Sequence, residues 1–261
     1  MDQETEDTEF RYPNVIDFFG TTLSHLCHFT TIDLHNYAAY NKYAENNIEK
    51  SNCRLSDEIN KSLETNDEKY HEDIIDSYSQ EIREFGDIYP PMHRKAMVIT
   101  LYNFFEHQIK TLCTEVNKLI PQDMSADYKW KDNVCIKSCR KFLKREASFE
   151  INPGGVFWKR WEDMLKVAQI RHVLVHSEGE IEKHRAERLA DIDSYTKQKK
   201  DIRLIQHRII IDEGYVAGLI EELISFFELL DKQVRAFIQR YEKGHGRFVV
   251  PLPLGASRTP L

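Results

Sequence analysis

The chain has 261 residues, of which 41% are apolar and 11% aromatic, enough to build a hydrophobic core in one large domain or two small ones. No apolar run approaches the roughly 18 residues of a membrane span, and the acidic N-terminus MDQETEDTEF lacks the basic or apolar character of a targeting peptide. These features exclude an integral membrane protein and predict a globular, cytoplasmic one that binds no membrane.

Charge is distributed unevenly along the chain, although the net charge is only −7. Residues 1–91 contain 20 acidic and seven basic side chains, a balance of −13, whereas residues 92–261 contain 23 acidic and 29 basic ones, a balance of +6. Three basic runs, at residues 137–145, 197–200 and 235–243, either contact phosphates or form solvated faces of helices.

The cysteines are five in number and include no CxxC pair, which argues against a disulfide framework and against a zinc ribbon. We expect reduced thiols, most of them buried.

The N-terminal part of the chain is expected to be helical after a disordered acidic tail, residues 1–11. From Pro13 to about Lys50, apolar residues recur every three or four positions, which predicts a helix. Residues 46–66 are polar and predict a connector that contains a short helix.

A second helix, over about residues 68–85, is expected to end at Gly86 and the Pro90-Pro91 pair. Because the charge balance changes sign at the same place, the sequence predicts a boundary there. It separates an acidic helical segment, residues 12–91, from a second helical domain, residues 92–243.

The rest of the chain predicts an all-α domain with at most one short β element. Residues 202–211 are rich in isoleucine and predict a strand or hairpin, and residues 244–261 predict an irregular tail. Helices are expected over residues 92–119, 131–146, 156–175, 182–197 and 212–241.

The segment QIRHVLVHSEG, residues 169–179, contains a cation, two imidazoles and a hydroxyl within seven consecutive residues. Arg171, His172, His176 and Ser177 flank an apolar run and lie at the C-terminal end of an expected helix. Such cations either act on a substrate or simply satisfy the free carbonyls and the dipole of the helix end.

A metal site is one interpretation of the two histidines. His172 and His176 are four residues apart and share one helix face, a spacing common in zinc sites. The segment lacks the glutamate of an HExxH motif, and no clear third ligand follows. A zinc hydrolase that uses both histidines therefore stays a lesser alternative.

Arg171 and His176 are separated by five residues, which places their side chains about 140° apart on a straight helix. Either the helix ends between them, since Ser177 to Gly179 form a plausible stop, or a second chain completes the site.

This arrangement resembles the HEPN family (higher eukaryotes and prokaryotes nucleotide-binding), whose motif is an arginine, four to six residues and a histidine at the end of a long helix. Arg171, His172 and His176 match the motif, and the following SEG is typical of members. The helices LYNFFEHQIKTL (101–112) and YVAGLIEELISFFELL (215–230) resemble the helix beside the motif and the closing helix of the family. The resemblance covers about residues 92–240 and implies a compact helical bundle.

The resemblance also implies a metal-independent endoribonuclease that needs no cofactor. The 2′-OH of RNA attacks the phosphate while one histidine accepts its proton, another protonates the 5′ oxygen, and arginine stabilises the added charge. The products are a 2′,3′-cyclic phosphate and a 5′-OH. Because acid and base are two tasks, two motifs are expected to meet across a homodimer.

Site roles follow from the resemblance. Arg171 and His176 are predicted to be catalytic, with His172, Glu106 and Ser177 in supporting positions. His172 either orients Arg171 or holds a phosphate, or is a polar residue of the helix surface. Glu106 either pairs with Arg171 or His172 or is an ion-pair partner at the edge of the core.

Small chains of this kind favour a role in bacterial toxin or anti-phage defence, with an antitoxin or regulatory protein as a further partner. The alternative from another class is a HEPN fold used as a non-catalytic dimeric binding or scaffold module. The intact Arg171 and His176 favour the enzyme, since a scaffold has no need of both.

Overall fold

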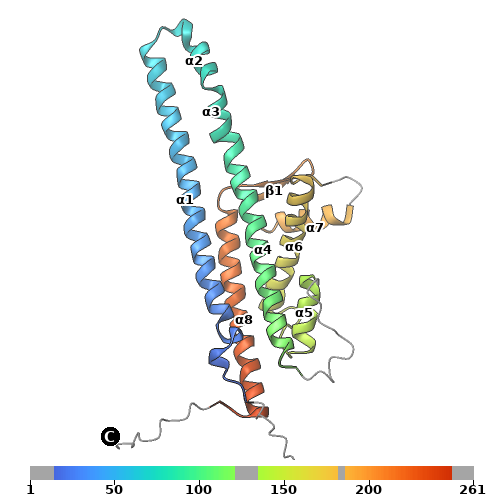
Figure 1. Cartoon of the computed structure of the whole chain (residues 1–261). Coiled ribbons are helices and arrows are strands. Elements are labelled where there is room, and N and C mark those ends of the chain that lie inside the picture. Colours follow the sequence, from blue (N-terminus) through green and yellow to red (C-terminus); the bar gives the residue numbers. More distant parts are fainter. Residues whose placement is uncertain (1–14, 121–134, 182–185, 249–261) are drawn as a thin grey trace, which may run out of the picture.

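The computed structural model describes residues 15–120, 135–181 and 186–248 (Figure 1). This part of the chain is all-α apart from one two-stranded antiparallel sheet, so the predicted fold class and the short β element are confirmed. The predicted disordered tail, residues 1–11, lies outside the described residues, as does most of the predicted C-terminal tail.

Helix α1 (Thr22–Thr65) follows a short 3₁₀ turn (η1, Phe18–Gly20) and runs for 44 residues, about 66 Å. The predicted connector over residues 46–66 is therefore wrong. Those residues are polar, but they include no glycine or proline, and polar side chains on an exposed helix are compatible with its backbone. The buried Leu55 supplies an apolar contact in this half of the helix.

The chain returns along α1 through α2 (His71–Ser77), α3 (Ser79–Arg83), a π-helical turn (η3, Glu84–Ile88) and α4 (Tyr89–Asn117). The predicted stop at Pro90-Pro91 is wrong, because the two prolines lie in the first turn of α4. Proline suits that turn, where the backbone N–H groups have no intrahelical acceptor.

The remaining elements match their predicted positions to within a few residues. The loop before α6 includes Gly154 with a φ of 82°, and Gln206 and His207 both have positive φ in the two-residue turn between the strands, as a type I′ hairpin requires. These elements are α5 (Ile136–Arg145), α6 (Val156–Ser177), α7 (Ala186–Thr196), β1 (Ile202–Ile205), β2 (Arg208–Ile211) and α8 (Tyr215–His245).

The core is centred on a cluster of aromatic rings from α4, α6 and α8. The ring of Phe226 lies 5.0 Å from that of Phe105 and 4.9 Å from that of Trp161, both edge-on. Leu23, Leu26 and Leu34 at the start of α1 belong to the same continuous core. The division of the chain at residue 91 stays a prediction, but the first half of α1 packs with the helices that follow it.

None of the described helices combines the length and the apolar character that crossing a bilayer requires. All five cysteines are free, as predicted: Cys27, Cys113 and Cys139 are buried, and Cys53 and Cys135 are exposed.

Candidate active site at the end of helix α6

The residues of the predicted motif lie on the last two turns of α6, which ends at Ser177. Glu178 and Gly179 adopt left-handed backbone conformations, with φ of 51° and 95°, and both donate their N–H to the carbonyl of Val173. This is the usual way to close a helix, and the predicted stop at Ser177 to Gly179 is confirmed. Of the two alternatives for Arg171 and His176, a helix end between them is ruled out, because α6 contains both, and completion of the site by a second chain stays a prediction.

Arg171 is held against α4, which lies beside α6. Its Nε donates a hydrogen bond to Oδ1 of Asn103 at 3.1 Å, and further along the same pair of helices Lys95 Nζ donates to the carbonyl of Glu178 at 3.1 Å. The buried Tyr102 lies near Arg171, and burial raises the pKa of its hydroxyl strongly, with the carboxylate of Glu106 adding to the effect. Arg171 is thus a positioned, half-buried cation rather than a freely moving one.

The two histidines lie on a different face of α6 from Arg171. The rings of His172 and His176 stack obliquely, with centroids 4.5 Å apart, and His176 is exposed while His172 is half-buried. They border a pocket of about 130 Å³ whose lining is completed by Val173, Ser177, Glu180, Ile181 and Arg188. The pocket therefore brings two imidazoles together with one cation and one carboxylate.

Arg171 and His176 do not meet within one chain. In residues 15–120, 135–181 and 186–248, no hydrogen bond or ion pair joins their side chains: Arg171 bonds to Asn103, and His176 contacts His172. The divergence expected from a five-residue spacing is therefore real in this helix. A single chain presents an arginine on one face and a pair of histidines on another.

Glu106 has a partner other than the two that the sequence suggested. Its carboxylate forms an ion pair with Lys110, one turn further along α4, at 3.1 Å. This contact favours the interpretation of Glu106 as an ion-pair partner at the edge of the core. Ser177, the other supporting residue, lies in the lining of the histidine pocket.

Two residues of this region were missed or undervalued by sequence reasoning. Asn103 lies one turn before Glu106 on α4. This nearness to Glu106 is the only feature of the sequence that points to Asn103 as a site residue. Arg188 comes from α7 and reaches the histidine pocket only through tertiary packing, so nothing in its neighbourhood along the chain identifies it.

Among the described residues, no group of three or more His, Cys, Asp or Glu side chains is arranged to hold a metal ion. The zinc interpretation of His172 and His176 therefore has no third ligand in this part of the chain.

The basic runs are mostly occupied by internal contacts. Arg140 is buried, forms an ion pair with Glu162 and lies over the ring of Trp158. Lys199 lies between Asp163 and Glu222, and Arg235 pairs with Asp231. The largest exposed group of cations in these runs lies on one face of α5 and consists of Lys137, Lys141 and Lys144.

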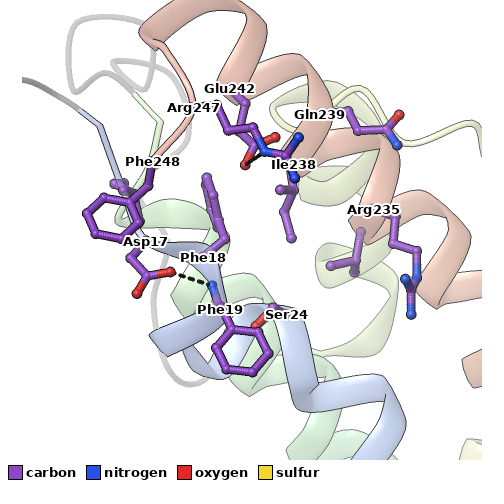
Figure 2. Close-up of a pocket in the computed structure, with 12 residues that line it drawn as sticks. Asp17, Phe18, Phe19, Ser24, Arg235, Ile238, Gln239, Glu242, Arg247 and Phe248 are labelled. Carbon is purple, nitrogen blue, oxygen red and sulfur yellow. Dashed lines mark hydrogen bonds and ion pairs between the residues drawn. The ribbon is translucent and has the colours of Figure 1, made fainter. Parts of the chain in front are cut away.

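A larger pocket, of about 340 Å³, lies at the far end of α8 from the β hairpin. Figure 2 shows it between the η1 turn and the last turns of α8, with Phe18, Arg235 and Arg247 on its walls. In the same view Asp17 accepts a hydrogen bond from the backbone N–H of Phe19. It shares no residue with the histidine pocket.

No protein-family model, curated protein or solved structure matches the chain.

Proposed function

We propose that the chain is a metal-independent endoribonuclease that cleaves RNA through attack of the 2′-OH, leaving 2′,3′-cyclic phosphate and 5′-OH ends. The observation that supports this proposal is the end of α6, where Asn103 positions Arg171 and where His176 is exposed in contact with His172. These are the group types that phosphodiester cleavage without a metal requires.

The chemistry assigns one task to each group. A neutral His176 accepts the proton of the 2′-OH, and a protonated histidine donates one to the leaving 5′ oxygen. Arg171 stabilises the charge that develops on the phosphate, since its planar guanidinium binds two phosphate oxygens at once. His172, with its ring 4.5 Å from that of His176, orients that ring or holds a neighbouring phosphate.

The working unit in this proposal is a homodimer. Arg171 and His176 lie on different faces of one helix, and one histidine cannot be acid and base in the same step. A composite site contains both residues from both chains. A role in bacterial toxin or anti-phage defence, with an antitoxin or regulatory protein as partner, belongs to the same proposal and rests on the family resemblance.

The test is incubation of the purified protein with total RNA, with and without excess EDTA. Wild type is expected to cleave RNA equally under both conditions. Arg171→Ala and His176→Ala are expected to abolish cleavage with an unchanged circular dichroism spectrum, because neither side chain lies in the core. Arg83→Ala and His35→Ala, exposed changes elsewhere, are the matched controls. Native-rate cleavage by a folded double variant would refute the proposal.

Subunit mixing tests the composite site. Wild type refolded with an equal amount of His176→Ala chain gives about a quarter of dimers with both histidines. If catalysis needs both an acid and a base, activity per total protein falls to about a quarter of wild type. A fall to only about half means that each chain works alone.

One observation favours the second candidate, a non-catalytic binding or scaffold module. Five of the eleven cations of the basic runs form ion pairs with carboxylates of the same chain, which leaves a smaller basic surface for RNA than the sequence suggested. This candidate predicts no RNA cleavage by wild type under any of the conditions above.

A further inference from the structure

One face of α1 carries exposed apolar side chains that no other described segment covers. Phe29, Ile32, Tyr40 and Tyr43 are 58%, 44%, 55% and 68% exposed. At 100° per residue they lie within a stripe about 80° wide, together with Asn36. The opposite face of the helix enters the core, and Figure 1 shows α1 along one outer edge of the molecule.

The stripe also lacks formal charge over a length of two dozen residues. The other stripe positions between residues 22 and 47 are Thr22, His25 and Asn47. Further along the same helix the stripe continues with Lys50 and Arg54, both exposed. An uncharged apolar stripe that ends in cations is a surface suited to a protein partner with complementary charge.

We propose that this stripe binds the same stripe of a second copy of the chain, with the two α1 helices antiparallel. The positions are symmetric about Asn36: Ile32 and Tyr40 are four residues from it, and Phe29 and Tyr43 are seven. A two-fold axis at Asn36 thus pairs Phe29 with the partner's Tyr43 and Ile32 with the partner's Tyr40. An isologous contact of this kind closes on itself and gives a dimer.

Charge complementarity supports the same register. When Asn36 faces its own copy, Lys50 comes opposite the partner's Thr22 at the start of α1, and Arg54 comes opposite the partner's Phe18 in the η1 turn. That region contains the exposed Asp17. A parallel arrangement instead places Lys50 and Arg54 beside their own copies, which is repulsive.

The area is sufficient for a stable pair. Phe19, 81% exposed, extends the stripe through its edge-on contact with His25. At roughly 200 Å² for a whole aromatic side chain, the exposed parts of the apolar residues amount to about 600 Å² in each copy. Two copies together reach about 1,200 Å², above the roughly 1,000 Å² that a specific interface needs.

The proposed axis lies level with the candidate site. Tyr37, next to Asn36, contacts Phe104 on α4 with ring centroids 5.3 Å apart, and Asn103 beside it holds Arg171. The inference goes beyond the proposed function, because it follows from α1 alone and does not depend on RNA cleavage. The interface is a second one, separate from the contact that would join the ends of two α6 helices, since α1 packs against α4 and α8 whereas the end of α6 faces α4 and α7.

The first test is the mass of the purified full-length chain in solution, by sedimentation equilibrium. Wild type is expected to be a dimer through α1 alone, or a tetramer where the ends of α6 join as well. Ile32→Glu with Tyr43→Glu is expected to weaken association by at least roughly 100-fold, because each charge is buried without a partner. Ile75→Glu, an equally exposed apolar position on α2, is the control and keeps the wild-type mass. A monomeric wild type, or a mass that the double substitution leaves unchanged, overturns the inference.

The second test does not depend on disruptive changes. In a Cys53→Ser, Cys135→Ser background, Asn36→Cys lies on the proposed axis and is expected to form a disulfide-linked dimer with oxidised glutathione. Lys61→Cys, on the same helix but far from the axis, stays monomeric on a non-reducing gel. Failure of Asn36→Cys to crosslink, or equal crosslinking by Lys61→Cys, contradicts the antiparallel register. RNA cleavage is scored separately, so failure of the ribonuclease proposal is distinguishable from failure of this one.

Discussion

The molecule has two regions that are built from the same kind of helix and differ in what the helices bury. In the helical arm, residues 42–96, Leu55 alone is buried, and the arm extends beyond the rest of the chain in Figure 1. In the body, the remaining described residues, rings from three helices form a continuous core. The difference shows that a helix forms in either region, with or without an apolar period, while only the body gains the large free energy of burying apolar area.

Charge separates the two regions as well. Residues 57–87 of the arm contain 11 acidic and three basic side chains, a net charge of −8. The candidate site belongs to the body, where several cations are paired with carboxylates of the same chain. The arm is thus a helical extension whose outer part, residues 57–87, is strongly negative, and its stability and its charge can each be changed without touching the core.

The largest expected effect is on the body. Phe226→Ala removes a ring that contacts Phe105 and Trp161 in the fully buried cluster, and we expect it to lower the free energy of unfolding by about 3–5 kcal/mol. Urea unfolding followed by tryptophan fluorescence measures the loss. A loss below about 1 kcal/mol would mean that the aromatic cluster is not the centre of stability.

The arm is expected to respond less and more locally. Leu55→Ala removes its buried side chain, and we expect a cost of about 1–2 kcal/mol that appears as faster hydrogen exchange in the arm alone. Exchange followed by mass spectrometry resolves peptides of both regions, with Ser56→Ala as the exposed control. Faster exchange in α6 and α8 would show that arm and body unfold together.

The charge of the arm gives a third contrast. Replacing Glu72, Asp73 and Asp76 by their amides is expected to raise RNA affinity severalfold at low salt, because these exposed carboxylates repel the phosphate backbone. Fluorescence anisotropy with a labelled RNA measures it. The gain is expected to shrink as salt screens the field. An affinity that is unchanged at every salt concentration rules out this repulsion.

The smallest expected effect concerns the junction of the two regions, where His93 Nε2 and Asn41 Oδ1 lie 3.0 Å apart. Burial lowers the pKa of His93, which means that the folded protein favours the neutral ring. The unfolded chain takes up the proton first, so stability is expected to decline as the pH falls below the ordinary value of about 6.5. Melting temperatures between about pH 7.5 and 5.5 should show this decline in wild type and a smaller one in His93→Gln.

Much of the fold could be predicted because local patterns decide it. The period of apolar residues located every long helix, and the dense isoleucines at residues 202–211 located the hairpin. The two errors have one cause. Residues 46–66 and Pro90-Pro91 were expected to interrupt helices, but polarity does not break a helix and proline is tolerated in a first turn.

The sequence by itself determined the helices, the end of α6 at Ser177, and the presence of Arg171 and His176 on it. Spacing also determined that these two side chains diverge, because the geometry of a helix is local. Only the tertiary structure decided that Arg171 reaches Asn103 and that Arg188 joins the histidine pocket. Those contacts join residues far apart in the chain, and they depend on which helices pack together, a result of the whole core rather than of any short segment.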